Sequence, residues 1–460
     1  MRIVCIGAGY VGTVTAAAFA ALGHETILVD VDERKLQAIQ QGRSPIYEPG
    51  LDQLLEYVVT RHLTATASME GVAEADAVFI CVGTPENADH SVNLSYIKQA
   101  AIQIGNHLNP RRFTVIVTKS TVPVGSADLV SSLIEAHSRT KSGSCFTVVS
   151  NPEFLREGSA LTDVFFPDRI VIGSAHPRGS TVMKQLYRNF MKRTFDPLVM
   201  DMIKGKEYRL KPKPVYLETD PKSAELIKYA SNAFLAVKIS YINEIARLCE
   251  ALGSNVSEVA KGMGLDHRIG SQFLEVSSGW GGSCFPKDTA ELLATSTKYD
   301  RELTIVRAAV EANQRMMEHV VSKLKQRMKT LQGKTIAVLG LTFKPNTDDI
   351  RNSQAIVIIR MLEELGAFVQ AHDPKGMPGF RKLHPELSVR YCEHAEEAAA
   401  HADALLLLTH WEEYRTLPWE RIRASMRRPY ILDTRRLWSG VGLPRLGFRY
   451  ETLGADHDAG

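Results

Sequence analysis

Short apolar segments alternate with longer amphipathic segments over roughly the first 215 residues. Valine and isoleucine dominate the apolar segments, which are RIVCI, ETILVD, DAVFICV, FTVIVT, FTVVS and RIVIG. Strands of a parallel sheet that is covered by helices have this continuous apolar character. The pattern predicts an α/β domain over residues 1–215, with a mostly parallel sheet and helices on its faces.

The pattern changes after this domain. Residues 223–252 form an alanine-rich stretch without glycine or proline, which lies between Pro221 and Gly253. This composition predicts one long helix that is buried on more than one side. Such a helix commonly bridges two domains, and its apolar surplus suits the interface of a homodimer.

The α/β pattern returns near residue 334, as a second copy of the opening unit. The strand KTIAVLGLTF, the helix IVIIRMLEELG and the strand AFVQAHDP follow the order of the first unit, but GLTFK at 340–344 replaces the glycine-rich turn. We therefore expect an α/β fold with two Rossmann-like parallel-sheet domains joined by a long central helix. The expected domains are residues 1–215, 216–325 and 326–460.

Composition narrows the class of protein. Hydrophobic residues make up 44% of the chain, charged residues 23%, and the net charge is only +3. These values exclude a disordered, fibrous or polycationic chain and favour no nucleic-acid partner. The six cysteines are scattered, with no metal-ligand spacing among them or with the histidines. A reduced cytoplasmic protein without a metal is the expectation.

The apolar stretch from Ile3 to Leu22 could be read as a secretory signal or a membrane span. Gly7, Gly9 and Gly12 interrupt it, and each would cost about 1 kcal/mol in a helix interior. The same glycines suit a strand, a tight turn and a helix. Since no other stretch is long and apolar enough, we expect no membrane span.

The sequence GAGYVG at residues 7–12 indicates a dinucleotide site. A strand precedes it, a helix follows it, and Asp30 ends the next strand 18 residues beyond Gly12. Such glycines let the backbone approach a pyrophosphate, and the acid can bind the ribose hydroxyls. Asp30 favours NAD over NADP, although Lys35 could accommodate a phosphate. A glycine turn beside a surface aspartate is the alternative.

Three further loops begin where predicted strands end. They are CVGTP at 81–85, TKSTVPVG at 118–125 and NPEFLREG at 151–158. Ligands bind at the carboxyl ends of parallel strands in open α/β folds. Each loop could be a simple turn, but three beside a dinucleotide turn predict a ligand site.

The stretch GWGGSCFPKD at residues 279–288 presents one thiol. Pro286 suits the first turn of a helix, so Cys284 should stand at its N-terminus with Lys287 one turn along. A helix N-terminus and a cation both lower the pKa of a thiol, and the glycines would let backbone amides approach a ligand. The alternative is a small buried hydrophobic residue.

Two pairs of polar residues have helical spacing. Lys228 and Asn232 are four residues apart on the long helix, and Glu153 and Glu157 are four apart in the third loop. Both pairs could be ordinary solvent-facing residues. The residues alone support a nicotinamide oxidoreductase with a candidate nucleophilic thiol, which is useful when an aldehyde is oxidised to an acid. A two-electron hydroxyacid dehydrogenase, with Cys284 purely structural, is the rival.

Motifs along nearly the whole chain carry a family resemblance. They are GAGYVG, CVGTP, KSTVPVG, SNPEFLREGSA, SAELIKYASNAFLA, GGSCFPKD, GLTFKPNTDDIR, HDP and LDTRRL. In these the chain resembles the UDP-glucose/GDP-mannose dehydrogenase family. The resemblance implies a two-step, four-electron oxidation of the C6 alcohol of UDP-glucose to the carboxylate, with two NAD⁺. Phe285 favours UDP-glucose; GDP-mannose, a UDP-N-acetylhexosamine, or a non-catalytic UDP-sugar-binding protein are the alternatives.

The resemblance also implies catalytic roles. Cys284 matches the nucleophile, and Lys228 with Asn232 matches the pair that stabilises the oxyanion. Asp288, with a water held by Thr121, matches the group that takes the alcohol proton, and Glu153 matches one linked to thioester hydrolysis. Which acid acts in which step stays open.

Binding roles follow from the same resemblance. Arg268 matches an arginine that reaches the substrate of a neighbouring subunit. The implied cofactor contacts are Gly7, Gly9, Tyr10, Val11, Gly12, Asp30, Lys35, Thr84, Thr121, Glu157 and Lys287. The implied substrate contacts are Phe154, Leu155, Arg156, Lys228, Asn232, Arg268, Phe273, Gly281, Phe343, Lys344 and Arg435. The chain departs from the family pattern at Trp280, at His410 and in a longer stretch at 203–214.

Overall fold

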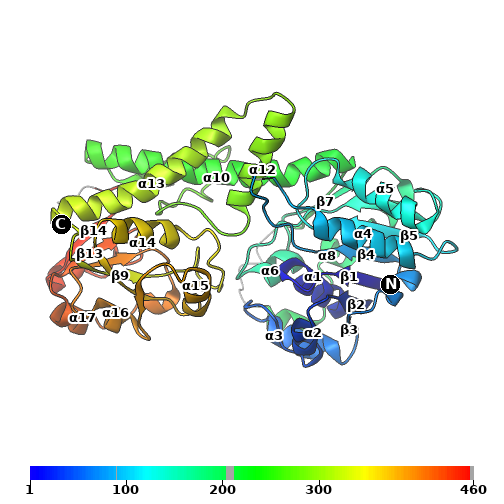
Figure 1. The fold of residues 1–460 in the computed structure, drawn as a ribbon, viewed down its shortest axis with the longest axis horizontal. Coiled ribbons are helices and arrows are strands. Elements are labelled where there is room, and N and C mark those ends of the chain that lie inside the picture. Colours follow the sequence, from blue (N-terminus) through cyan, green and yellow to red (C-terminus); the bar gives the residue numbers. More distant parts are fainter. Residues whose placement is uncertain (90, 204–211, 456–460) are drawn as a thin grey trace. The chain divides into compact units, whose positions relative to one another are not determined.

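The computed structural model describes residues 1–89, 91–203 and 212–455. The chain divides into two compact units, Met1–Ala230 and Ser231–Gly460, and each is built around its own sheet (Figure 1). Most of the long stretch at 203–214, namely 204–211, lies outside the described residues.

The first unit contains an eight-stranded sheet in the order β3-β2-β1-β4-β5-β6-β7-β8. Neighbouring strands are parallel except β6 and β7, so the predicted mostly parallel sheet is confirmed. The sequence pattern did not predict β3 and β8. The strands are β1 Arg2–Ile6, β2 Glu25–Val29, β3 Leu63–Thr66, β4 Ala77–Ile80, β5 Thr114–Thr118, β6 Phe146–Ser150, β7 Arg169–Ser174 and β8 Val215–Thr219.

Helices cover both faces of this sheet. Ile3 and Cys5 of β1 pack into one core, while Val4 and Ile6 pack into another, because successive side chains of a strand point to opposite faces. The first core contains α1, α3 and α6, and the second contains α4 and α5. The helices are α1 Tyr10–Ala21, α2 Glu33–Gln40, α3 Leu51–Val59, α4 Ser95–His107, α5 Ser126–Ser138, α6 Ala160–Phe165, α7 Pro177–Leu186, α8 Arg188–Lys192 and α9 Pro197–Met202.

The predicted long helix is confirmed as α10, Pro221–Leu252. Residues 221–230 belong to the first unit and residues 231–252 to the second. In the second unit Ile242 and Ala246 are fully buried, whereas Phe234 and Leu248 are 63% and 52% exposed. One face of α10 is therefore open in the single chain, which corrects the expectation of burial on more than one side at these positions.

The second unit contains six parallel strands in the order β11-β10-β9-β12-β13-β14. The expected second copy of the opening unit is confirmed, because a strand, a helix and an adjacent parallel strand (β9, α14, β10) follow one another as β1, α1 and β2 do. The strands are β9 Thr335–Leu339, β10 Phe368–His372, β11 Val389–Tyr391, β12 Ala404–Leu407, β13 Tyr430–Asp433 and β14 Arg449–Thr452.

The second sheet also has helices on both faces. Ile336 and Val338 pack with α10, α13 and α14, and Ala337 and Leu339 pack with α16 and α17. The helices that follow α10 are α11 Val256–Gly264, α12 Phe285–Lys298, α13 Thr304–Met328, α14 Gln354–Glu364, α15 Met377–Leu383, α16 Ala395–Ala399 and α17 Trp419–Ser425.

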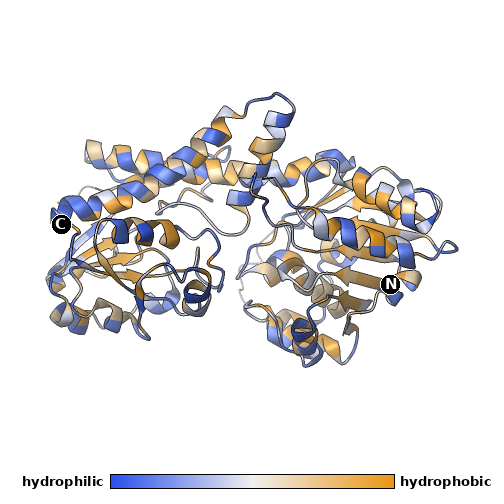
Figure 2. Ribbon diagram, viewed as in Figure 1, coloured by the Kyte–Doolittle hydropathy of each residue, from blue (hydrophilic) through white to orange (hydrophobic). Residues whose placement is uncertain are grey.

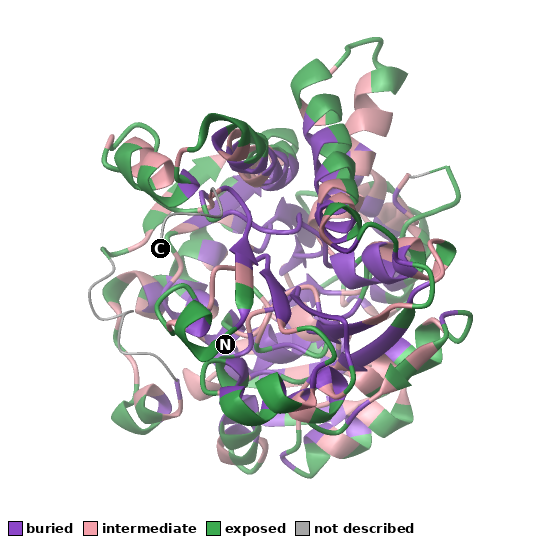
Figure 3. Cartoon of the chain, turned by 90° about the vertical axis from the view of Figure 1, so that its left-hand side faces the viewer, coloured by how far each residue is buried: buried purple, intermediate pink, exposed green. Residues whose placement is uncertain are grey.

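The hydropathy and the burial of the residues agree with two sheets that are each covered by helices. The strands are mostly apolar and buried, and the helices carry polar, exposed outer faces (Figures 2 and 3). In the described part of the chain, no helix combines the length and apolar character that a membrane crossing requires. The described residues also contain no group of three or more His, Cys, Asp or Glu side chains that could hold a metal ion.

Candidate active site

The carboxyl edge of the first sheet carries the predicted cofactor residues. Strands β2, β1, β4, β5 and β6 are successive parallel neighbours, so the loops that follow them lie along one edge. Tyr10 and Val11 begin α1, and Lys35 lies in α2. The loops along this edge carry Gly7 and Gly9 after β1, Asp30 after β2, Thr84 after β4, Thr121 after β5, and Glu153 and Glu157 after β6.

The glycine-rich turn has the shape that a pyrophosphate requires. Gly7 has φ +106°, which favours glycine, and a Cβ on Gly12 would collide with the carbonyl oxygen of Gly7. A Cβ on Gly9 would meet no atom within 4 Å, so the backbone is open beside the N-terminus of α1. Among the described residues no side chain caps this terminus, so its backbone amides suit an anion.

Asp30 is fixed next to this turn. Its Oδ2 accepts a hydrogen bond from Ala8 N at 2.5 Å, and its Oδ1 accepts one from Asp32 N at 2.8 Å. Lys35 Nζ lies 3.9 Å from Asp30 Oδ2, so the cation is paired with the acid. The carboxylate, the bare turn and the helix terminus together fit the ribose and pyrophosphate of a dinucleotide.

Glu153 and Lys228 form a buried ion pair. Lys228 Nζ donates to Glu153 Oε1 at 2.9 Å, and the two side chains are only 5% and 6% exposed. Glu153 Oε2 accepts a hydrogen bond from Leu155 N. Burial opposes ionisation of Glu153, but attraction to Lys228 and these hydrogen bonds outweigh it and lower its pKa. The carboxylate is therefore held in its charged form.

Phe154, which follows Glu153, lies close to two cations. Arg169 Cζ is 4.0 Å and Lys228 Nζ is 5.4 Å from the centre of its ring. Arg156 makes a bidentate contact with Asp163 at 2.8 and 2.9 Å. These contacts fix the NPEFLREG loop, but they show no direct role for Phe154, Leu155 or Arg156 in binding a substrate.

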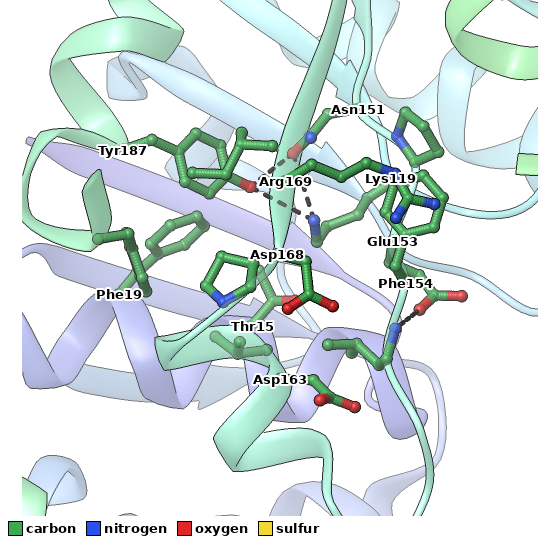
Figure 4. A pocket seen from close by; sticks show the side chains of 16 residues that line it. Thr15, Phe19, Lys119, Asn151, Glu153, Phe154, Asp163, Asp168, Arg169 and Tyr187 are labelled. Atoms are coloured by element: carbon green, nitrogen blue, oxygen red, sulfur yellow. Dashed lines mark hydrogen bonds between the residues drawn. The ribbon is translucent and has the colours of Figure 1, made fainter. Parts of the chain in front are cut away.

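Lys119 is a buried cation that the sequence interpretation did not single out. Its Nζ donates to Asn151 Oδ1 at 3.2 Å and to Tyr187 Oη at 3.3 Å, and Tyr187 Oη donates to Asn151 Oδ1 at 2.5 Å (Figure 4). Burial lowers the pKa of Lys119. The available signal was a lysine placed directly after the apolar strand TVIVT.

Glu225 anchors α10 within the first unit. It lies three residues before Lys228, and it accepts hydrogen bonds from Gly125 N at 2.7 Å, Ala127 N at 2.9 Å and Ser150 Oγ at 3.0 Å. These amides belong to the start of α5, so a distant side chain caps that helix. Burial raises the pKa of Glu225 in spite of the hydrogen bonds.

Glu48 contacts both Tyr10 and the backbone of the NPEFLREG loop. The Tyr10 hydroxyl donates to Glu48 Oε2, and it accepts a hydrogen bond from Gly158 N at 2.8 Å. Glu48 Oε1 accepts from Ala160 N at 2.7 Å. Burial, followed by the charge of Glu48, raises the pKa of Tyr10. A predicted cofactor residue therefore ties the dinucleotide turn to the NPEFLREG loop.

In the second unit, Cys284 stands at the N-cap of α12, as the sequence predicted. Asp288 is 1% exposed, and it accepts hydrogen bonds from Asn232 Nδ2 and from Lys287 Nζ, both at 2.6 Å. Asp288 N also donates to Cys284 O at 2.8 Å. Four of the predicted residues therefore lie together, namely Asn232, Cys284, Lys287 and Asp288. The Lys287 ammonium forms an ion pair with the Asp288 carboxylate. Of the six cysteines, only Cys284 is partly exposed.

The glycines before Cys284 are needed for packing within the protein. A Cβ on Gly281 would collide with the carbonyl oxygen of Asn352, and one on Gly282 would lie 2.7 Å from the ring of Phe343. Trp280 N donates to Asn313 Oδ1 at 2.8 Å, and Asn313 Nδ2 donates to Trp280 O at 2.9 Å. The sequence interpretation assigned the glycines to a ligand, whereas at Gly281 and Gly282 the close neighbours are protein atoms.

Trp280, a departure from the family pattern, is integrated into this packing. Its indole Nε1 donates to Ser240 Oγ at 2.9 Å, and the side chain is buried. Its ring lies 6.4 Å from the ring of Phe285 in an edge-on arrangement. The Trp280 side chain therefore packs beside Phe285, and its indole N–H has a hydrogen-bond acceptor.

Loops at the carboxyl edge of the second sheet carry Phe343, Lys344, His410 and Arg435. Arg435 Nε donates to Leu408 O at 2.8 Å, and burial lowers the pKa of Arg435 to about 10. Burial and the charge of Arg435 lower the pKa of His410 to about 3, so the imidazole is neutral. These loops follow β9, β12 and β13, which are adjacent parallel strands, and they form a basic edge.

Two further predicted substrate residues, Arg268 and Phe273, lie in the segment between α11 and α12. Arg268 is exposed after α11, and its guanidinium is paired with Asp266 at 2.6 Å. Phe273 has φ +64°, and its ring lies 6.4 Å from that of Phe285. The described contacts do not connect Arg268 with Cys284.

The fold and these two groups of residues define the class of protein. A dinucleotide turn on one parallel sheet, a basic edge on a second, and a thiol at a helix N-terminus are typical of a nucleotide-dependent oxidoreductase.

The chain belongs to the UDP-glucose/GDP-mannose dehydrogenase family. Residues 1–191 match its NAD binding domain, residues 222–315 its central domain and residues 337–440 its UDP binding domain. The resemblance and the NAD cofactor inferred from the sequence are thereby confirmed.

Similar proteins match along their full length. A UDP-glucose 6-dehydrogenase of Rhizobium meliloti (strain 1021) is 44% identical over 466 residues, covering 99% of both chains. The structure of a UDP-glucose dehydrogenase from the archaeon Pyrobaculum islandicum has a TM-score of 0.86 at 36% identity, covering 99% of this chain and 98% of that one. A UDP-D-ManNAc dehydrogenase from Pyrococcus horikoshii has a TM-score of 0.82 at 26% identity, covering 99% of both chains.

Proposed function

We propose that the protein oxidises UDP-glucose at C6 to UDP-glucuronate in two NAD-dependent steps. One observation carries the proposal: Cys284 stands at a helix N-terminus one turn from a buried Asp288 that Asn232 and Lys287 hold. A thiol in this position suits the passage from an aldehyde to an acid, which a simple alcohol dehydrogenase does not need. Full-length similarity to UDP-glucose 6-dehydrogenases supports the substrate.

In the first step the C6 alcohol loses a proton and a hydride. Bound NAD⁺ supplies the hydride acceptor in each of the two oxidations. We assign the proton to Asp288 with a water held by Thr121. Lys228 and Asn232 are one turn apart on α10, and they provide a cation and an amide donor for the oxygen that becomes negative.

In the second step the Cys284 thiolate adds to the aldehyde carbon to form a thiohemiacetal. The amides at the N-terminus of α12 favour the thiolate form. Loss of the second hydride gives a thioester, and water cleaves it to the carboxylate and the free thiol. We assign activation of this water to Glu153, because its carboxylate is kept ionised.

The basic edge of the second sheet is the proposed UDP site. Lys344 and Arg435 would bind the diphosphate, and Phe343 lies beside them on the same edge. The remaining proposed contacts, at Phe154, Leu155, Arg156, Arg268, Phe273 and Gly281, rest on the family resemblance. The division into residues 1–215, 216–325 and 326–460 is likewise retained as a proposal.

The test is the number of NADH molecules formed per sugar. Purified protein is mixed with limiting UDP-glucose and excess NAD⁺, in wild-type form and as Cys284→Ser. We expect two NADH per sugar from the wild type, and loss or stalling of turnover in the variant. One NADH per sugar, or a Cys284→Ser variant as fast as the wild type, would contradict the thioester route.

The same assay separates the alternative substrates. GDP-mannose and UDP-N-acetylhexosamines replace UDP-glucose at equal concentration, and kcat/KM is compared. We expect UDP-glucose to have the highest value. Binding of UDP-glucose and NAD⁺ without NADH from any sugar would instead indicate a non-catalytic sensor.

We also propose that two copies associate through α10. Leu226, Phe234, Tyr241 and Leu248 are each at least 45% exposed, and they recur at intervals of seven or eight residues, so they lie along one side of the helix. A continuous apolar stripe of this kind suits a second copy of the same chain. Sedimentation should show a dimer that Phe234→Asp dissociates, while Leu265→Asp, at another exposed leucine, leaves it intact.

The proposed location is the cytoplasm. All six cysteines are free, which suits a reducing compartment. Fractionation of cells that express the tagged full-length chain would test this assignment, and recovery of the protein outside the cytoplasmic fraction would contradict it.

A further inference from the structure

A cavity of about 70 Å³ with both polar and apolar walls lies beside Glu153 in the first unit (Figure 4). Its walls include the buried side chains of Lys119, Glu153 and Thr15. Asp168, which also lines it, is exposed, so the walls of the cavity include both a residue at the surface of this unit and the proposed catalytic residue Glu153.

Two buried polar groups on the wall lack a full set of partners among the described residues. The Lys119 ammonium has three N–H groups and donates to two acceptors, Asn151 and Tyr187. The Thr15 hydroxyl is 2% exposed and has no hydrogen-bond partner in the described part of the chain. Buried polar groups are normally satisfied by protein or by ordered water.

The cavity has the size and the chemistry to hold water. One ordered water needs roughly 10–15 Å³ and two to four polar partners. The cavity is several times larger, and it offers a donor at Lys119, a hydroxyl at Thr15 and acceptor oxygens at Glu153. A wholly apolar cavity of this size would stay dry, whereas this one has polar groups on its walls that can hold water.

We propose that this cavity holds the water that cleaves the thioester and that it connects Glu153 to solvent. The inference rests on the proposed function and identifies the source of the water that the last step, hydrolysis of the thioester, consumes. The water oxygen adds to the thioester carbonyl carbon, Glu153 takes one proton, and the carbon–sulfur bond breaks to release the Cys284 thiolate. The product is the carboxylate, and Glu153 returns its proton to solvent through the same waters.

A separate source of water is needed, because the thioester forms in a site that the substrate and the cofactor fill. Bound ligands exclude bulk water, which protects the intermediates but also removes the hydrolytic reactant. The Lys119 charge acts in the same direction as Lys228, since both lower the pKa of Glu153 and keep its carboxylate ready to accept a proton.

Thr15→Val tests the proposal, because it removes the hydroxyl anchor and keeps the side-chain volume. Thr13→Val is the matched control: Thr13 lies on the same helix, is fully buried, does not line the cavity, and likewise has a hydroxyl without a partner among the residues that the structure describes. Enzyme in excess is mixed with UDP-glucose and saturating NAD⁺, samples are quenched with acid, and the mass of the Cys284 adduct is followed with time.

We expect both NADH molecules to form at the wild-type rate in Thr15→Val, while the adduct decays about tenfold more slowly. The KM values for UDP-glucose and NAD⁺ should be unchanged, and Thr13→Val should match the wild type. Equal rates of adduct decay in Thr15→Val and the wild type would overturn the proposal, as would an equal slowing in both variants.

Should Thr15→Val fail to fold, Asp168→Phe obstructs the exposed end of the cavity without disturbing the core. It should slow decay of the adduct in the same way, and a wild-type decay rate would overturn the proposal. Failure of the proposed function has a different signature, because the wild type would then form no Cys284 adduct and at most one NADH per sugar.

Discussion

The ammonium of Lys228 lies 2.9 Å from Glu153 Oε1, and the two residues are 75 positions apart in the chain. Neither charge can be buried at this depth without the other, since an isolated buried ion loses its hydration without compensation. The pair therefore holds the start of α10 against the loop that follows β6, and it sets the charge of two proposed catalytic groups at once.

Removal of one charge should destabilise the protein. Glu153→Gln leaves the Lys228 ammonium buried with only an amide oxygen, and we expect the free energy of unfolding in urea at pH 7 to fall by about 3 kcal/mol. Glu153→Gln combined with Lys228→Met should recover part of this loss. The exposed pair between Arg360 and Glu386 provides the control, since Glu386→Gln should have no measurable effect. Equal stability of Glu153→Gln and the wild type would contradict the prediction.

The same residue should contribute to acid denaturation. The pKa of Glu153 in the folded state lies below its ordinary value of 4.5, so its stabilising contribution is complete above about pH 4.5. The contribution is lost as the pH falls through the folded-state pKa. Urea unfolding of Glu153→Gln should therefore depend less steeply on pH below 4.5 than unfolding of the wild type, and parallel profiles would argue against an ionised Glu153.

Glu225→Gln should also be destabilising, although the side chain keeps its shape. Both carboxylate oxygens accept backbone hydrogen bonds, from Gly125 N and Ala127 N, and a glutamine can offer only one oxygen to them. One buried amide is left without an acceptor, which costs about 1–3 kcal/mol. Thermal unfolding should show a lower Tm, and an unchanged Tm would mean that water replaces the lost acceptor.

Gly281→Ala should impair the loop before Cys284. The added methyl group would collide with the carbonyl oxygen of Asn352, which belongs to the backbone and cannot rotate away. We expect loss of turnover by at least tenfold, together with a lower Tm. Gly262→Ala on α11 is the control, because its Cβ meets no atom within 4 Å, and a helical glycine-to-alanine change is neutral or stabilising. Similar behaviour of the two variants would contradict this explanation of the glycine.

His410 should make the stability depend on pH in a weakly acidic range. Its pKa falls from an ordinary 6.5 to about 3 in the folded state, because burial and Arg435 disfavour the charged form. The unfolded chain therefore binds a proton below pH 6.5 that the folded chain does not, and stability falls as the pH decreases from 6.5 towards 3. His410→Gln should flatten the profile of unfolding free energy between pH 6.5 and 4, and an unchanged slope would contradict the assignment.

The sequence predicted those features that local chemistry determines. The turn at Gly7 needs a positive φ, α10 follows from a long stretch without glycine or proline, and the position of Cys284 follows from Pro286 at the start of α12. Strands β3 and β8 were not predicted, because they are short or largely exposed and lack a continuous apolar run.

Features that depend on distant partners could not be predicted. Glu225 caps a helix 98 to 100 positions away, and Glu48 accepts amides 110 and 112 positions away, so neither role has a local signal. The reason for Gly281 is of the same kind, since the atom that excludes a Cβ there belongs to Asn352. The direction of β7 could not be predicted either, because a strand that is buried on both faces has the same continuous apolar run in a parallel and in an antiparallel pair.

The burial of five of the six cysteines makes the protein selective towards reagents that attack sulfur. Cys5, Cys81, Cys145, Cys249 and Cys392 are buried, while Cys284 is partly exposed and stands at the N-terminus of α12. An alkylating agent or a peroxide should therefore modify one position first and inactivate the enzyme in proportion. The folded chain can be titrated, tagged or oxidised at the proposed nucleophile without any cysteine being removed.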